Sequence, residues 1–145
     1  MNNSCGRNIM MLRMLTPLLL HDLNVSASWC DRKITIPKWW GIKDAIDLSA
    51  ADFKGYWTLP GASSGSPDVL VSVYSWKKPS PYRHLLVVGN LRSVDRPLDL
   101  KFDDAALGIN NATKFTELWN DQSLSREELR TKMLKAYNFM LIGIE

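Results

Sequence analysis

The chain has 145 residues, of which 46% are hydrophobic and 23% are charged. This composition is that of an average globular protein with one core, and it indicates neither a disordered chain nor a membrane-spanning protein. The formal net charge is only +3 and the basic residues are scattered along the sequence. The sequence therefore predicts no nucleic-acid partner, because surfaces that bind nucleic acid carry clustered Lys and Arg side chains.

Residues 1–23 are predicted to form an amphipathic helix. Five apolar side chains recur at spacings of three and four, and so share one side of a helix: Met10, Met11, Met14, Leu15 and Leu18. The apolar run, interrupted by Arg13, is too short to cross a bilayer. A cleaved signal peptide stays open as an alternative, because a small-residue site at Val25-Ser26-Ala27 follows the run. We expect the apolar side of the helix to face a partner surface or to support self-association.

The next segment, residues 24–52, contains many aromatic side chains without regular periodicity. A short extended piece is predicted at Ile34 and Ile36, ending at Pro37, and the remainder is interpreted as an irregular crossing segment. Trp39 and Trp40 have no evident place in a core. Because an indole ring can stack on the flat face of a sugar ring, these two residues are the candidates for a carbohydrate or interdomain contact, with a core role as the alternative.

Short strands are predicted from residue 53 onward. The first is expected within Phe53 to Trp57, and the turn-rich loop from Pro60 to Pro67 follows it. The strongest signal is a β-hairpin between Val69 and Leu91, in which two apolar runs flank a turn with two prolines. The first run alternates, which predicts one wetted face. The second is apolar almost throughout, which predicts a strand covered on both sides.

The C-terminal third adds further short elements. Leu98, Leu100 and Phe102 alternate with polar residues as in a half-buried strand, and one helical turn closed by Gly108 is expected next. Extended chain is expected at 114–119, then a reverse turn at 120–122. Signals conflict in 125–136, where a capping box at Ser125 favours a helix. We favour a short turn at Ser125 followed by two strands, because tertiary context often overrides helix propensity.

These segments together predict a mainly β fold. An antiparallel β-sandwich is expected in residues 53–145, preceded by the N-terminal amphipathic helix of 1–23 and the crossing segment of 24–52. The residues expected to be buried in its core are Val71, Val73, Leu86, Val88, Leu100 and Ile142.

No motif in the sequence marks a metal, cofactor or nucleophile site. The two histidines, His21 and His84, have no cysteines or carboxylates at metal-ligand spacing, and His84 is interpreted as a structural residue at the start of a buried strand. Cys5 and Cys30 lack a nucleophile signature, and their spacing does not decide whether they form a disulfide. We therefore predict no metal and no cofactor.

Paired carboxylates are the remaining candidates for catalysis. Two acids held about 5–10 Å apart across a cleft can hydrolyse a glycosidic bond. The pairs Asp103-Asp104 and Glu127-Glu128 lie beside turns, where solvated acids are common, and adjacent residues on a strand point to opposite faces. The sequence therefore favours a chain with no catalytic residues and no catalytic activity of its own.

Five stretches follow one another in a recognisable order: Leu19-Leu20-His21-Asp22, Phe53-Lys54-Gly55-Tyr56-Trp57, Val69-Leu70-Val71-Ser72-Val73-Tyr74, Leu86-Val87-Val88-Gly89-Asn90-Leu91 and Phe139-Met140-Leu141-Ile142-Gly143-Ile144-Glu145. In this order the chain resembles the C-terminal part of large bacterial glycoside hydrolase-like proteins, including those described as family 123-like. In such proteins a (β/α) barrel carries catalysis and a β-sandwich follows it. The resemblance implies that residues 1–23 are similar to a last barrel helix and that the sandwich begins near residue 53.

The resemblance implies a non-catalytic accessory module. Catalytic acids of barrel enzymes lie at the C-terminal ends of barrel strands, and no position here matches one. The implied role is to stabilise or flank a catalytic barrel of the parent protein, which would be the partner; the alternative is a carbohydrate-binding module that uses exposed tryptophans. Neither nucleic acid nor membrane is an expected partner. The location would be extracellular or periplasmic if the parent is secreted.

Overall fold

The computed structural model describes residues 8–25, 35–78 and 81–145 of the chain. The protein is mainly β, as predicted, and its centre is a six-stranded antiparallel sheet in the order β1-β3-β4-β10-β7-β8. Its strands are β1 (Asp52–Lys54), β3 (Val69–Ser75), β4 (His84–Asn90), β7 (Phe115–Glu117), β8 (Gln122–Leu124) and β10 (Phe139–Ile144).

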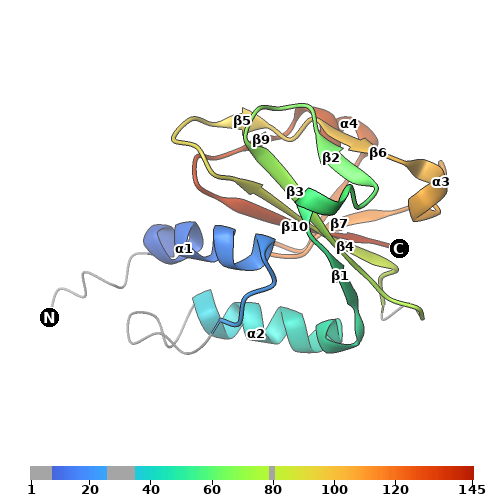
Figure 1. Cartoon of the computed structure of the whole chain (residues 1–145), viewed down its shortest axis with the longest axis horizontal. Coiled ribbons are helices and arrows are strands. Elements are labelled where there is room, and N and C mark those ends of the chain that lie inside the picture. Colours follow the sequence, from blue (N-terminus) through green and yellow to red (C-terminus); the bar gives the residue numbers. More distant parts are fainter. Residues whose placement is uncertain (1–7, 26–34, 79–80) are drawn as a thin grey trace, which may run out of the picture.

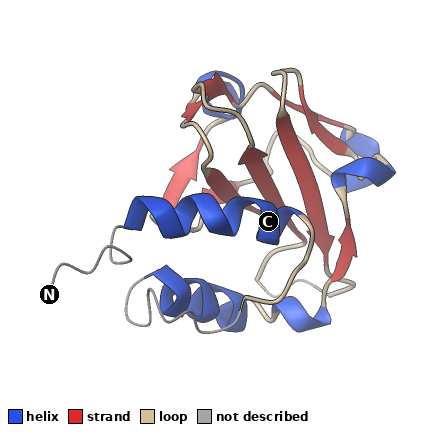
Figure 2. Ribbon diagram, turned by 60° about the vertical axis from the view of Figure 1, so that its left-hand side comes forward, coloured by secondary structure: helices blue, strands red, loops and turns tan. Residues whose placement is uncertain are grey.

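Further elements cover both faces of this sheet. Helices α1 (Asn8–Leu20) and α2 (Thr35–Ala45) lie on one side of it (Figure 1; Figure 2). The other side carries two small antiparallel sheets, formed by β2 (Ala62–Ser64) with β6 (Leu100–Phe102) and by β5 (Arg96–Pro97) with β9 (Met133–Leu134). The short helices are η1 (Leu48–Ala50), η2 (Tyr56–Thr58), α3 (Asp104–Leu107) and α4 (Arg126–Thr131).

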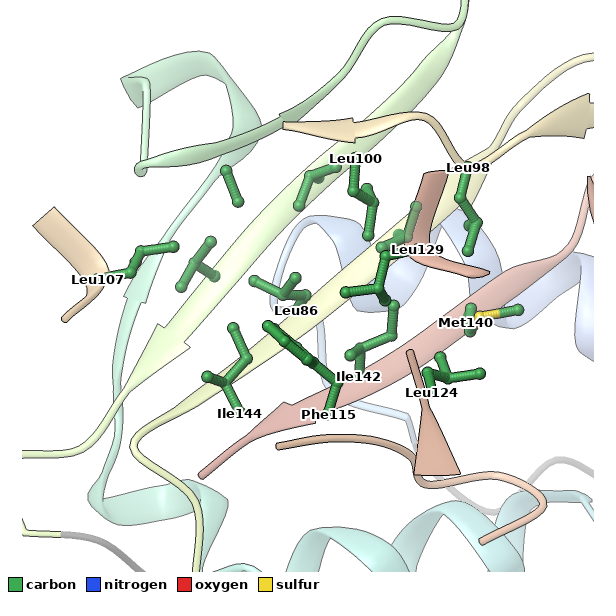
Figure 3. Packing of buried hydrophobic residues seen from close by; sticks show 14 of the residues in the cluster. Leu86, Leu98, Leu100, Leu107, Phe115, Leu124, Leu129, Met140, Ile142 and Ile144 are labelled. Carbon is green, nitrogen blue, oxygen red and sulfur yellow. The ribbon is translucent and has the colours of Figure 1, made fainter. Parts of the chain in front are cut away.

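The predicted hairpin is confirmed. Strands β3 and β4 pair antiparallel along their full lengths, with Val71 opposite Val88 and Val73 opposite Leu86. The six residues predicted for the core are all buried. They pack with Phe115, Leu124 and Leu129 between the central sheet and the two small sheets (Figure 3). As predicted from its continuous apolar run, β4 is covered on both sides, since Leu85 to Asn90 are buried without interruption.

The prediction of a wetted face on β3 is wrong. Ser72 and Tyr74, which alternate with the core valines, are 0% and 3% exposed. Helix α1 covers them, and the Ser72 hydroxyl donates a hydrogen bond of 2.8 Å to the carbonyl oxygen of Leu20 at the end of this helix. An alternating pattern predicts one polar face, but a serine with a hydrogen-bond partner can be buried without an unpaired polar group.

Helix α1 packs part of its apolar side against the sheet. Leu15, Leu19 and Leu20 are at most 2% exposed and pack against residues of β3, β4 and β10. The expectation that Leu15 faces outward is therefore wrong. Met14, in contrast, does face outward, since it is 51% exposed. The side chains of Met10 and Met11, and both cysteines, lie outside the part of the chain that the structure describes.

The aromatic segment contains a regular helix that the sequence interpretation missed. Residues 35–45 form α2, so the extended piece predicted at Ile34 and Ile36 is wrong at Ile36, whereas Ile34 lies outside the residues that the structure describes. Pro37 misled that prediction, yet it occupies the third position of the helix. The first-turn N–H groups have no intrahelical partner, so proline costs little there. In the part of the chain that the structure describes, no helix is long and apolar enough to cross a membrane.

Two local predictions near the C-terminus have different outcomes. The helical turn closed by Gly108 is confirmed: Asp103 caps the N-terminus of α3, and Gly108 adopts the left-handed conformation with φ 66°. The turn favoured at Ser125 is wrong, because the full capping box forms and residues 126–131 are helical before β9 and β10 follow. The predicted loop from Pro60 to Pro67 likewise contains strand β2, which pairs with the distant β6.

Candidate functional site

The two predicted contact residues belong to the helical layer. Trp39 is 4% exposed and packs in the cluster under α1 with Leu19 and Leu48. Trp40 is half-buried, and its indole N–H donates a hydrogen bond of 2.9 Å to the carbonyl oxygen of Val25. Trp39 therefore has no ring face available to stack on a sugar, and Trp40 is held against the neighbouring loop.

Among the tryptophans that the structure describes, the exposed one is Trp57, in η2. Trp57 is 57% exposed, and Leu59, two positions later, is 91% exposed. The sequence interpretation placed Trp57 in the strand expected within Phe53 to Trp57, but β1 ends at Lys54 and the chain turns into η2 directly afterwards. The sequence signal that could have predicted this turn is Gly55 together with Thr58, whose hydroxyl bonds to the carbonyl oxygen of Gly55.

Local bonds fix the turn that carries Trp57. Both the backbone N–H and the hydroxyl of Thr58 donate to the carbonyl oxygen of Gly55, at 2.9 and 2.7 Å. The backbone N–H of Tyr56 donates to the hydroxyl of Ser72 on β3, at 3.1 Å. The Trp57 ring lies so close to Gly55 that a Cβ there would collide with it. Glycine is required at this position for that close approach.

Three other aromatic rings hold the Trp57 indole. Its centroid lies 5.6 Å from that of His21, with the two planes at 18°, which is a stacked arrangement. Tyr56 and Phe53 meet it edge-on, at 5.0 and 6.1 Å. Such centroid separations are those of favourable aromatic pairs. We name these four residues, His21, Phe53, Tyr56 and Trp57, the aromatic cluster.

His21 and Tyr74 anchor the end of α1 to the sheet beside this cluster. The Nδ1–H of His21 donates to the carbonyl oxygen of Pro17 at 2.7 Å, and its Nε2 lies 3.2 Å from the Tyr56 hydroxyl. The Tyr74 hydroxyl donates to the carboxylate of Asp22 at 2.5 Å. Burial, reinforced by this carboxylate, raises the pKa of Tyr74 far above its ordinary value. Tyr74 therefore remains a neutral hydrogen-bond donor.

An open groove of about 390 Å³ begins at Tyr56 and runs over the β2–β6 pair. One part of its lining is apolar, from the side chains of Tyr56, Leu59 and Phe102. The other part is polar and contains Ser63, Lys101 and Asp103. Ser63 and Lys101 are directly opposite each other in the β2–β6 register, so the two strands place their side chains at the same level of the groove.

The acid pairs weighed as catalytic candidates have local structural roles. Asp103 accepts a hydrogen bond from the backbone N–H of Ala106 and caps α3, while Asp104 forms an ion pair with Arg126 at 3.5 Å. Glu127 contacts Arg130 at 2.7 Å. Glu128 accepts the backbone N–H of Ser125 at 2.8 Å, and this hydrogen bond holds the pKa of Glu128 below its ordinary value.

Two further titratable groups are bound within the fold. Glu117 is 3% exposed and accepts backbone N–H groups from Trp119 and Asn120, at 2.8 and 2.9 Å. The Nε2–H of His84 donates to the carbonyl oxygen of Leu107 at 2.9 Å, and the Ser75 hydroxyl lies 2.8 Å from Nδ1. Burial lowers the pKa of His84. Among the described residues, no three His, Cys, Asp or Glu are grouped to hold a metal ion.

Comparison with known proteins adds no assignment: the chain matches no family model, no curated protein and no solved structure. Function is therefore inferred from the sequence and from the geometry of the described residues.

Proposed function

We propose that the chain is a non-catalytic β-sandwich module of a glycoside hydrolase-like protein, which flanks or stabilises a catalytic barrel of that protein. The observation that carries the non-catalytic part is the use of all four candidate acids in helix caps and surface ion pairs. The sequence resemblance supports the other part of the proposal, that the chain is a β-sandwich module of a glycoside hydrolase-like protein.

The positions of these acids support a structural role. Asp103 and Asp104 are adjacent at the N-terminus of α3, and Glu127 and Glu128 are adjacent in the first turn of α4. Acidic side chains are favourable there because the N-terminal end of a helix carries partial positive charge and unpaired N–H groups. Glycoside hydrolysis instead needs one proton donor and one base or nucleophile on opposite sides of the scissile bond.

The buried side of α1 affects how a barrel would be contacted. Leu15, Leu19 and Leu20 are used inside the module, so a neighbouring barrel would meet the outer side of the helix. Met14 is 51% exposed on this outer side, and Arg13 lies 5.4 Å from the ring of Tyr137, which is 38% exposed. The same surface would serve self-association of isolated chains.

An activity assay tests the non-catalytic part. The purified chain is incubated with a panel of nitrophenyl glycosides, and we expect product release equal to that of a protein-free blank. Release above the blank that is lost in Asp103→Asn or Glu128→Gln, with circular dichroism unchanged, would contradict the proposal.

The coding sequence upstream tests the module part. A (β/α) barrel encoded in frame, or in the adjacent reading frame, is the expected result. An upstream neighbour unrelated to carbohydrate chemistry would count against the assignment, whatever the outcome of the activity assay.

A further inference from the structure

We propose that Trp57 and the groove beside it form a binding site for a pyranose oligosaccharide. The site differs from the one predicted at Trp39 and Trp40, and it does not depend on whether the chain flanks a barrel. It is built from two parts that meet at Tyr56: an exposed indole ring, and a groove whose lining is apolar on one part and polar on the other.

The indole ring has the properties of a preformed stacking surface. The aromatic cluster and Gly55 hold it in one orientation, yet 57% of the residue remains exposed. A ring that is already immobilised loses little conformational freedom when a ligand stacks on it. One face of the Trp57 indole stacks on His21, so a ligand would use the opposite face. A sugar ring presents a flat C–H face, which complements such an indole face.

The groove carries polar groups that can form hydrogen bonds with the hydroxyl groups at the edge of a sugar ring. Its volume of about 390 Å³ lies within the range of roughly 300–1,000 Å³ typical of small-molecule sites. Ser63, Lys101 and Asp103 bring a hydroxyl, an ammonium and a carboxylate to its lining, and such groups bond sugar hydroxyls in both directions. Trp57 itself does not line the groove, but Tyr56 does, and the Tyr56 ring lies 5.0 Å from that of Trp57. Tyr56 therefore connects the two parts of the site.

Leu59 marks the rim of the same site. It is 91% exposed and adopts φ 53°, a conformation that side-chain-bearing residues rarely adopt. The combination of an apolar rim, a fixed indole and a polar wall matches a ligand with one apolar face and a hydroxylated edge. An apolar protein partner would leave Lys101 and Asp103 without a matching surface.

Binding is tested on the full chain with isotope labelling of the tryptophan indole N–H groups. Cellohexaose, xylohexaose and chitohexaose are each titrated, and the Trp57 signal is identified by its absence from Trp57→Ala. We expect at least one hexasaccharide to shift the Trp57 signal and to leave that of buried Trp76 in place. Affinity should fall about tenfold or more in Trp57→Ala and less in Trp57→Tyr, which keeps a stacking ring.

Tyr137→Ala is the matched control, because it removes an exposed aromatic side chain outside the groove. It should bind the hexasaccharide as the unchanged chain does, whereas Lys101→Ala should weaken binding several-fold. The proposal is overturned if none of the three sugars shifts the Trp57 signal at millimolar concentration, or if Trp57→Ala binds with unchanged affinity. Neither result would alter the expectation for the activity assay, so failure here is distinguishable from failure of the proposed function.

Discussion

Replacing Leu20 by alanine should strongly destabilise the protein. Leu20 is 0% exposed and sits directly on β4: a Cβ at Gly89 would lie only 2.5 Å from the Leu20 Cδ1 atom. Because the helix and the sheet are in close contact here, the space left by truncation cannot be filled easily. Leu→Ala substitutions in such cores reduce the free energy of unfolding by about 2–5 kcal/mol.

This loss should be visible in the midpoint of thermal unfolding. A domain of this size loses roughly 2–4 °C per kcal/mol, so Leu20→Ala should lower the midpoint by about 4–20 °C. Met14→Ala is the control on the same helix, since Met14 is 51% exposed. An exposed substitution of this kind changes the free energy of unfolding by about 0.5 kcal/mol or less. Both variants and the unchanged chain are compared by calorimetry and circular dichroism in one buffer.

The comparison decides between two descriptions of the N-terminal segment. A midpoint for Leu20→Ala within about 2 °C of the unchanged chain would mean that α1 does not pack on the sheet. Residues 1–23 would then be the detachable, outward-facing helix that the sequence alone predicts. A large loss confined to Leu20→Ala would place α1 inside the cooperative unit.

Two further predictions concern packing and pH. Gly89→Ala should be destabilising, because the added methyl group would press on Leu20. Gly41→Ala should instead raise the free energy of unfolding by up to about 1 kcal/mol, since Gly41 lies in α2 and no atom is near the added Cβ. Equal midpoints of thermal unfolding for the two variants would contradict this prediction. Burial lowers the pKa of His84 below its ordinary value of 6.5, so below that pH the unfolded chain binds more protons and stability should fall as pH decreases. The corresponding fall should be smaller in His84→Gln, and a pH profile identical to that of the unchanged chain would refute the assignment.

Some features were predictable because their signals are local. The β3–β4 hairpin follows from two β-branched runs and a short turn between them. The capping box at Ser125 and Glu128 needs residues only three positions apart. It correctly indicated a helix here, although we had expected tertiary contacts to impose a turn instead. Gly108 closes α3 for the same reason, because a left-handed residue is needed directly after the last helical turn.

Other features were decided by segments far apart in the chain. Whether the Ser72 face of β3 is wet depends on α1, whose last carbonyl group binds that serine across 52 positions. Likewise, Trp39 is buried because α2 packs beneath α1, while Trp57 is exposed because β1 ends early and the chain turns outward. A sequence window records the polarity and spacing of neighbours, but burial depends on which distant surface arrives to cover them. The candidate groove depends on the same kind of contact, since β2 and β6 form it only by pairing.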